Sequence, residues 1–381
     1  MSQTLSAKIK VPYEYKVHFS KNLFNINNRT LINVLKNVQP QSFLVLIEKK
    51  VYLLHEKLEE SIRKYFEITL KTSLPKEHIQ VHTGSEECKN SDTILNNILK
   101  HIDKLKICRH SIIITIGGGA FLDCCSYAAS IAHRGIPCIR IPTTVLSQND
   151  SGLGVKNGIN IFNKKNFIGC FQPPFAVLND SAFLKTLDTR NWLSGCAEAI
   201  KVSLFKDANF FNFLCENGKK ISEGNSVLME DLIYTCAKLH LEHITESQDP
   251  FERTSSRPLD FGHWFAHKLE SVSNYKILHG EAVAIGIGID SYYSFKKGLC
   301  TESINHQVQQ CLKNFNFPLS IKEYQIQLDK DLIQTALNEF REHIGGTMCI
   351  PLLKEPGYCI EVDNIDLSLM YASINDFFSK V

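Results

Sequence analysis

The sequence predicts an α/β protein whose first half is a parallel sheet covered by helices and whose second half is mostly α-helical. Short β-branched runs alternate with helical stretches up to about residue 175, and after about residue 178 the pattern changes to long amphipathic segments. The chain of 381 residues is also long enough for two hydrophobic cores. We therefore expect an α/β domain at residues 1–175 and a helical domain at residues 176–381.

Four runs in the first half have the length and composition of buried strands. They are rich in Ile, Val and Leu and lie at residues 43–47, 79–82, 111–116 and 137–141. Because helical stretches separate them, they should pair in parallel, with helices on both faces of the sheet. In the second half, amphipathic periodicity predicts helices at residues 227–246, 262–273, 281–297 and 329–343. The boundary near Pro173 and Pro174 is inferred only from this change of period.

The composition argues against several classes of protein. The 42 basic and 40 acidic residues nearly cancel, so no global field attracts nucleic acid or an anionic membrane. The amino terminus is polar and no stretch reaches the roughly 18 apolar residues of a membrane span, so neither secretion nor membrane insertion is expected. Thirteen cysteines without a C-x-x-C pair indicate reduced thiols in a cytoplasmic protein.

A nucleotide site is indicated where the third predicted strand runs into Gly117, Gly118 and Gly119 and then into a helix. Glycines let the backbone approach a pyrophosphate, and the amides and dipole at a helix start favour negative charge. The run departs from the G-x-G-x-x-G fingerprint, and an ordinary tight turn is the alternative. Because Thr143 and Thr144 follow the next strand, both loops should meet at one edge, as in a Rossmann-like dinucleotide site.

A metal site is indicated by histidines in the second half. His263 and His267 are four residues apart on one helical face, and His279 lies twelve residues further at an expected helix start. A lone histidine is more often a packing or surface residue than a ligand, but three in this span favour a site. No H-E-x-x-H motif suggests a protease. Glu198, one turn before Lys201, offers a carboxylate, and a His2Glu set leaves positions open as catalytic zinc sites do.

A phosphate site is indicated by residues 148–160 and 163–169, which are rich in Gly, Asn and Lys. A loop of this composition makes a cradle for a phosphate ester. The alternative is a solvated lysine loop.

Taken in order, these blocks resemble the dehydroquinate synthase superfamily, whose sugar phosphate cyclases use NAD and zinc. The superfamily carries G-G-G-x-x-x-D, P-T-T-x-L, D-S-x-x-G-x-K, K-N-x-x-G, G-x-x-E-x-x-K, F-G-H-x-x-x-H and L-H-G-E-A-V. The matching blocks span residues 117–283, and seven blocks in the same order make the resemblance specific.

The resemblance implies a role for each matching position. The metal ligands, for zinc or cobalt, are Glu198, His263 and His279. The NAD-binding residues are Glu86, Lys89, Gly118, Gly119, Asp123, Thr143, Thr144, Asp150, Lys165, Phe183, Thr186 and Leu187. The substrate-site and catalytic residues are Asp150, Lys156, Asn166, Lys201, Lys238 and His267. Arg134 matches an arginine that the family donates to the phosphate across the interface of a homodimer.

Differences within the superfamily bear on the substrate. Dehydroquinate synthase has an asparagine before F-G-H and an arginine four residues earlier, and this chain has Asp260 and Ser256 there. A carboxylate at residue 260 would repel a substrate carboxylate, so we expect Asp260 to accept hydrogen bonds from neutral hydroxyls. Residues 249–252, 257–264 and 339–346 resemble the 2-epi-5-epi-valiolone synthases, and the last segment adds Arg341 and His343 as substrate-binding residues.

This subgroup resemblance implies a carbon–oxygen lyase reaction on sedoheptulose 7-phosphate. NAD+ oxidises the C5 hydroxyl, phosphate leaves by β-elimination, the hydride returns to C5, and the opened chain closes in an intramolecular aldol step, so NAD is not consumed. His267 is the expected proton relay, while Lys156, Asn166 and Arg134 hold the phosphate. The alternatives are 3-dehydroquinate synthase, a metal-dependent polyol or glycerol-type dehydrogenase, and a scaffold without catalysis.

Overall fold

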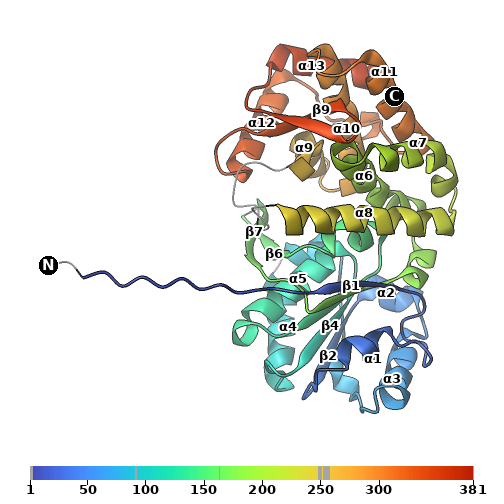
Figure 1. The fold of residues 1–381 in the computed structure, drawn as a ribbon, viewed down its shortest axis with the longest axis vertical. Helices are drawn as coiled ribbons and strands as arrows, with labels where there is room; N and C mark the ends of the chain where they lie inside the picture. Colours follow the sequence, from blue (N-terminus) through green and yellow to red (C-terminus); the bar gives the residue numbers. More distant parts are fainter. Residues whose placement is uncertain (1–2, 91, 163, 248–250, 252–257, 381) are drawn as a thin grey trace.

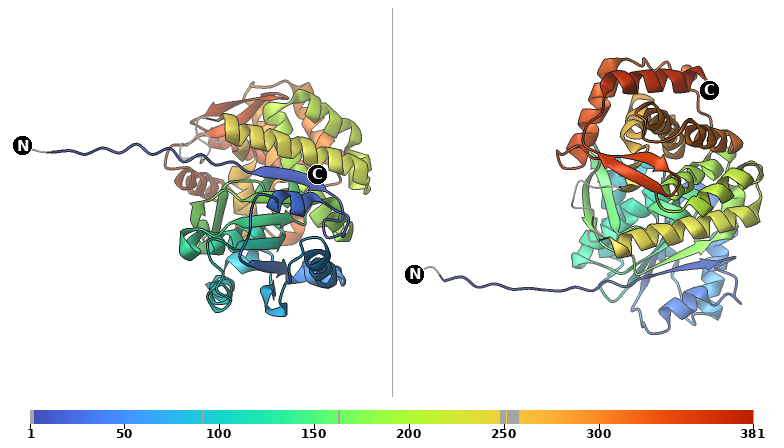
Figure 2. Two further views of the ribbon diagram at one scale, coloured as in Figure 1. Left: turned by 60° about the horizontal axis from the view of Figure 1, so that its bottom comes forward. Right: turned by 45° about the horizontal axis from the view of Figure 1, so that its top comes forward.

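The computed structural model describes residues 3–90, 92–162, 164–247, 251 and 258–380. Figure 1 shows a sheet-containing half and a helical half, with helix α8 (Ser226–Glu246) lying across the molecule between them. Residues 3–14 form an exposed extended segment that leaves the body of the protein, as the further views in Figure 2 also show. Asp249, Glu252, Ser256 and Arg257, which contribute to the subgroup prediction, lie outside the described residues.

The first half contains a parallel sheet, which in the described chain has six strands in the order β1-β8-β5-β4-β2-β3. The strands are β1 (Lys16–Ser20), β2 (Phe43–Glu48), β3 (Ile79–His82), β4 (Ile112–Gly117), β5 (Cys138–Pro142) and β8 (Ala176–Asp180). Strands β2, β3, β4 and β5 confirm the four predicted runs. Gly117 pairs with Pro142, so the glycine loop and the threonine loop leave the same edge of the sheet.

Helices cover both faces of this sheet because successive strand residues point to opposite sides. Val45 joins the cluster that contains Ile62 of α3 (Leu58–Ile68), whereas Leu46 joins the cluster that contains Ile98 of α4 (Asp92–Lys104). The helices of this half are α1 (Thr30–Leu35), α2 (Lys49–Leu54), α3 (Leu58–Ile68), α4 (Asp92–Lys104) and α5 (Gly119–Ile131). The predicted arrangement, a sheet between two helical layers, is confirmed.

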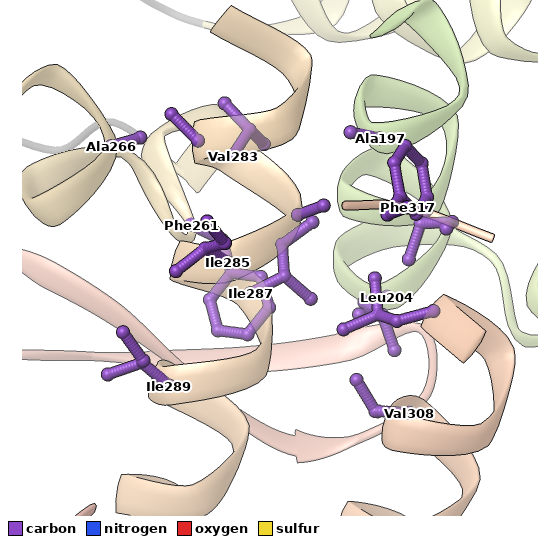
Figure 3. Close-up of a cluster of buried hydrophobic side chains, with 14 of the residues drawn as sticks. Ala197, Leu204, Phe261, Ala266, Val283, Ile285, Ile287, Ile289, Val308 and Phe317 are labelled. Carbon is purple, nitrogen blue, oxygen red and sulfur yellow. The ribbon is translucent and has the colours of Figure 1, made fainter. Parts of the chain in front are cut away.

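The second half is built around helix α10 (His279–Lys296), which is buried along most of its length. Figure 3 shows Ile287 of α10 on the side of Leu204 of α6 (Thr189–Lys206) in the apolar core, with Ile285 on the opposite side near Phe261. The remaining helices are α6 (Thr189–Lys206), α7 (Ala208–Ser222), α9 (His263–Val272), α11 (Glu302–Asn314), α12 (Lys330–His343) and α13 (Leu367–Ser379). Helices α8, α9, α10 and α12 confirm the four predicted segments within two residues at each end.

Two antiparallel hairpins depart from the sequence prediction. The segment expected to be a phosphate-binding loop forms a π-helical turn, η4 (Ser147–Ser151), and the strands β6 (Lys156–Ile161) and β7 (Lys164–Phe171). The helical half also contains β9 (Ile350–Glu355) and β10 (Tyr358–Val362). The polar residues that suggested a loop lie in this ribbon and the turn before it, where Asn157 and Asn160 of β6 are buried and β7 is exposed or half-buried.

The predicted domain boundary after residue 175 lies too early in the sequence. Strand β8 pairs with β1 and β5 in the parallel sheet, and the long helices begin only at α6. Pro173 and Pro174 therefore precede a sheet strand. The buried run of β8 is five residues long and carries no period that distinguishes a strand from a helix.

Short helical turns complete the described chain. They are η1 (Lys76–His78), η2 (Glu86–Lys89), η3 (Ala132–Arg134), η5 (Ser181–Thr186), η6 (Pro258–Asp260) and η7 (Lys322–Tyr324). Within the described ranges, none of the helices has the length and apolar character needed to cross a bilayer.

Candidate active site

A cavity of about 630 Å³ lies where the carboxyl edge of the sheet meets the helical half. Gly118 and Thr144 line it from the sheet, His263 and His279 line it from α9 and α10, and His240 lines it from α8. This is the position at which parallel α/β sheets bind ligands. The nucleotide and metal segments predicted separately from the sequence thus face one cavity.

The three predicted metal ligands converge. Oε1 of Glu198 lies 3.6 Å from Nε2 of His263 and 3.3 Å from Nε2 of His279. Their ligand atoms all lie within 4.8 Å of one another, and Glu198 is only 1% exposed. A buried carboxylate that faces two imidazoles suits a divalent cation, which would satisfy all three donors at once. The residues present therefore fit a zinc or cobalt ion.

Close backbone contacts bring these ligands together. A Cβ atom on Gly280 would lie 1.9 Å from the carbonyl oxygen of Ser194, and one on Gly286 would lie 1.9 Å from that of Gly262. Only glycine allows α10 to approach α6 and the start of α9 so closely. His279 is therefore held beside Glu198.

Two carboxylates set where α9 and α10 begin. Glu281 accepts a hydrogen bond from the backbone N–H of Leu278 at 2.9 Å, so α10 begins at His279. Asp290 accepts hydrogen bonds from the backbone N–H of Gly262 at 3.0 Å and from Nε1 of Trp264 at 2.8 Å. Asp290 thus holds the residues on either side of His263.

The two histidine ligands have opposite electrostatic environments. Burial and Lys201 lower the pKa of His263 to about 4, so this imidazole is neutral and ready to donate a lone pair. Burial also lowers the pKa of His279, but Glu270 and Glu198 outweigh it and raise the pKa to about 9. The pKa of His267 lies well below its usual range, through burial and then the neighbouring His263.

Glu270 joins the metal cluster to the nucleotide side, and the sequence prediction missed it. Its Oε2 lies 3.0 Å from Nδ1 of His279, and its Oε1 accepts from Nζ of Lys165 at 2.9 Å. A carboxylate behind a histidine orients the ring and fixes the nitrogen that faces the ion. The signal available in the sequence was the position of Glu270 one turn after His267.

The sheet edge supplies backbone groups and paired charges. Nζ of Lys89 donates to Asp123 at 2.8 Å, and Thr144 and Ser147 share a hydroxyl hydrogen bond of 2.8 Å. The Gly118 amide, expected to face a phosphate, donates instead to Oε2 of Glu48 at 2.7 Å. The sequence prediction missed Glu48, which also lines the cavity.

Most predicted site residues reach the cavity. Besides the two histidine ligands, the lining includes Glu86, Lys89, Gly118, Gly119, Asp123, Thr143, Thr144, Asp150, Lys156, Lys165, Asn166, Phe183, Thr186, Leu187, Lys201, Asp260, His267 and His343. Lys89 also donates to Asn166 of β7, which ties the hairpin to the nucleotide edge.

Three predicted residues lie elsewhere. Lys238 is 61% exposed and pairs with Glu242 on the outer face of α8. It is two residues from His240, so the two side chains point about 200° apart around the helix. The predicted role of Lys238 at the substrate is therefore wrong. Arg341, exposed near the end of α12, is likewise absent from the lining among the described residues. Arg134 is exposed after α5 and does not line the cavity of its own chain.

Comparisons with known proteins agree with this geometry. Residues 78–194 match the family described as 3-dehydroquinate synthase N-terminal, and residues 195–339 match 3-dehydroquinate synthase C-terminal. The chain is 39% identical to a 3-dehydroquinate synthase from Dictyoglomus thermophilum over 68% of this chain and 71% of that relative. It is 28% identical to a 2-epi-5-epi-valiolone synthase from an Actinomyces species over 92% of both chains.

A solved structure extends the similarity to the whole fold. It is 2-epi-5-epi-valiolone synthase from Streptomyces hygroscopicus subsp. jinggangensis with bound NAD+ and Zn2+, which superposes with a TM-score of 0.85 at 26% identity and covers 100% of both chains. Both family regions, the cavity and this fold indicate the same family. The chain belongs to the 3-dehydroquinate synthase superfamily and is a sugar phosphate cyclase.

Proposed function

We propose that this protein cyclises sedoheptulose 7-phosphate to 2-epi-5-epi-valiolone with release of phosphate, as a carbon–oxygen lyase. The observation that carries the proposal is the position of Asp260 in the cavity beside Lys201. Burial lowers the pKa of Lys201, but Glu198, Asp150 and Asp260 raise it above its usual range, so Lys201 is a cation among carboxylates. A substrate with hydroxyls at this end fits these groups better than one with its own carboxylate.

The extent of the similarity supports this substrate. The match to a valiolone synthase covers 92% of the chain, whereas two more identical 3-dehydroquinate synthases cover 68% and 81% of it. The residues from 340 to the carboxyl terminus, which include the cavity residue His343, lie beyond the 3-dehydroquinate synthase C-terminal match.

The cofactors proposed are NAD, bound along the carboxyl edge of the sheet, and zinc or cobalt held by Glu198, His263 and His279. When bound, they would accept and return a hydride and lower the pKa of the substrate hydroxyl that binds the metal. The pyrophosphate would meet the N-terminus of α5 at Gly119, and Asp123 and Lys89 would bind ribose hydroxyls.

The remaining roles are assigned from position. Lys201 and Asp150 would hold sugar hydroxyls near the metal ligands. His267 is half-buried beside His263, with ring centroids 5.5 Å apart, and its lowered pKa keeps it neutral, so it can relay a proton. Lys156 and Asn166 would hold the phosphate from the β6–β7 hairpin, with Arg134 contributed by the partner in a homodimer.

All thirteen cysteines are free, as in proteins of the reducing cytoplasm, where we place this enzyme.

The test is substrate choice with purified protein, NAD+ and zinc or cobalt. We expect phosphate release from sedoheptulose 7-phosphate, and none from the carboxylated heptulosonate substrate of 3-dehydroquinate synthase. Comparison of the product with authentic valiolone epimers by NMR identifies the stereochemistry. The reverse preference would establish 3-dehydroquinate synthase, which the relative at 39% identity favours as the second candidate. Stoichiometric NADH would establish a dehydrogenase.

A further inference from the structure

His240 is a cavity residue to which no role has been assigned so far. It projects from α8 and its side chain is 14% exposed. Ile244, one turn later, lines the same cavity, while Lys238 points to solvent. One face of α8 therefore belongs to the site, and His240 is the polar residue that this face contributes.

The contact of His240 is specific. Its Nδ1 lies 2.8 Å from Oδ1 of Asp150 in the π-helical turn η4, which is the distance of a charge-assisted hydrogen bond. Helix α8 packs against this turn, so the two residues are brought together by the packing of separate elements. Single π-helical turns are rare and often occur at functional sites.

Asp150 is suited to act as an acceptor. Burial and Glu198 raise the pKa of Asp150, but His240 and Lys201 outweigh them, and the pKa lies below its ordinary value. If Oδ1 accepts from His240, Oδ2 keeps its lone pairs for a ligand in the cavity. In the Nδ1–H tautomer Nε2 is an acceptor, and Nε2 lies on the side of Gly154, where a Cβ would be 4.0 Å away.

We propose that His240 is a positioning residue that donates from Nδ1–H to Asp150 and thereby holds this carboxylate toward a hydroxyl of the bound sugar. The inference rests on the proposed function for the identity of the sugar, and the contact itself is independent of it. Without this donor, the carboxylate would turn toward Lys201 and away from the ligand.

Two conservative variants separate positioning from proton transfer. The amide nitrogen of asparagine falls near Nδ1 of histidine, and that of glutamine falls near Nε2. His240→Asn should therefore keep kcat within about threefold, and His240→Gln should lower kcat by about 10- to 100-fold, the usual cost of losing a group that orients a site residue. KM should change less than kcat, and Lys238→Ala on the outer face of α8 should behave as wild type.

A double-mutant cycle with Asp150→Asn adds a readout that a merely structural role would not move. If His240 acts through Asp150, His240→Gln should cost little further activity in the Asp150→Asn background. Equal losses in His240→Asn and His240→Gln, with effects that add to those of Asp150→Asn, would overturn the proposal.

NMR of the imidazole nitrogens distinguishes failure of this inference from failure of the proposed function. In ¹⁵N-histidine-labelled protein, His240 should have the Nδ1–H tautomer, and its signals should shift in Asp150→Asn but not in Lys238→Ala. This result would support the contact even if sedoheptulose 7-phosphate proves not to be the substrate. An Nε2–H tautomer would overturn the inference even in an active cyclase.

Discussion

The two sides of the cavity are built in different ways. On the sheet side, the ligand-facing groups follow directly after strands β4 and β5, and the backbone at Gly118 and Gly119 forms part of the surface. On the helical side, side chains from α6, α9 and α10 converge from residues 198, 263 and 279. Figure 1 shows these helices packed together above the sheet.

This difference determines how each side of the cavity responds to amino-acid substitutions. The loops of the sheet side depend on local turns and on the register of neighbouring strands. The metal side depends on buried charges whose positions are set by Glu270, Asp290 and the glycine contacts of α10. Because an unpaired buried charge is costly, single substitutions should have larger effects on the helical side.

The largest effect is expected at the metal ligands themselves. Glu198→Ala or His263→Ala should remove bound zinc and lower phosphate release by about a thousandfold or more, because the ion would lose one of three protein donors. Metal content after dialysis and initial rates measure both effects. His267→Asn, one turn along α9, is the matched control: it should retain zinc while losing activity. A ligand variant that stays active without metal would contradict the assignment.

Next is the buried carboxylate Asp290. Burial raises its pKa to about 7, above its value in the unfolded chain, so the folded state binds the proton more tightly. The stabilising contribution of Asp290 to the free energy of unfolding is fully present below about pH 4. It is lost as the pH rises to about 7, a change on the order of 4 kcal/mol. Urea unfolding across this range should show Asp290→Asn gaining stability relative to wild type. A constant difference between the two proteins would contradict the prediction.

A smaller effect is expected where the two sides are joined. Glu270→Gln keeps the shape of the side chain but removes the charge shared by Lys165 and His279, so zinc affinity should fall by about 10- to 100-fold. NAD+ affinity should fall in the same variant, because Lys165 loses its partner. Competition with a chromogenic chelator and NAD+ fluorescence quenching measure these constants. Glu339→Gln, at a surface ion pair with Lys268, should change neither constant.

The smallest effect is expected on the sheet side. A Cβ on Gly118 would lie 3.4 Å from Cγ2 of Thr144, a contact that the protein can accommodate. Gly118→Ala should therefore fold normally and weaken NAD+ binding by only about tenfold, through the methyl group that faces the nucleotide. Isothermal titration with NAD+ tests this, with unchanged zinc content as the control. A loss of metal in Gly118→Ala would show that the two sides are not independent.

Contiguous motifs made the sheet side and part of the metal side predictable from sequence. The strand before Gly117 is a continuous apolar run, and His263 and His267 follow helical spacing, so local pattern alone indicated their elements. The resemblance to a family then connected Glu198 and His279 to the same site. The prediction that Lys238 binds the substrate was wrong because a position in a motif does not indicate which face of α8 is buried. The hairpin β6–β7 was missed because its polar composition resembles that of a loop.

By itself, the sequence determined the alternating first half, the helices of the second half, and the residue types able to hold a nucleotide and a metal, because these depend on period and composition along the chain. Tertiary structure alone decided that His240 meets Asp150, that Glu270 joins Lys165 to His279, and that Asp290 holds the turn before His263. These contacts join residues that are 28 to 105 positions apart or that lie on separately packed elements. Their geometry therefore depends on how the helices pack and not on the spacing of residues along the sequence.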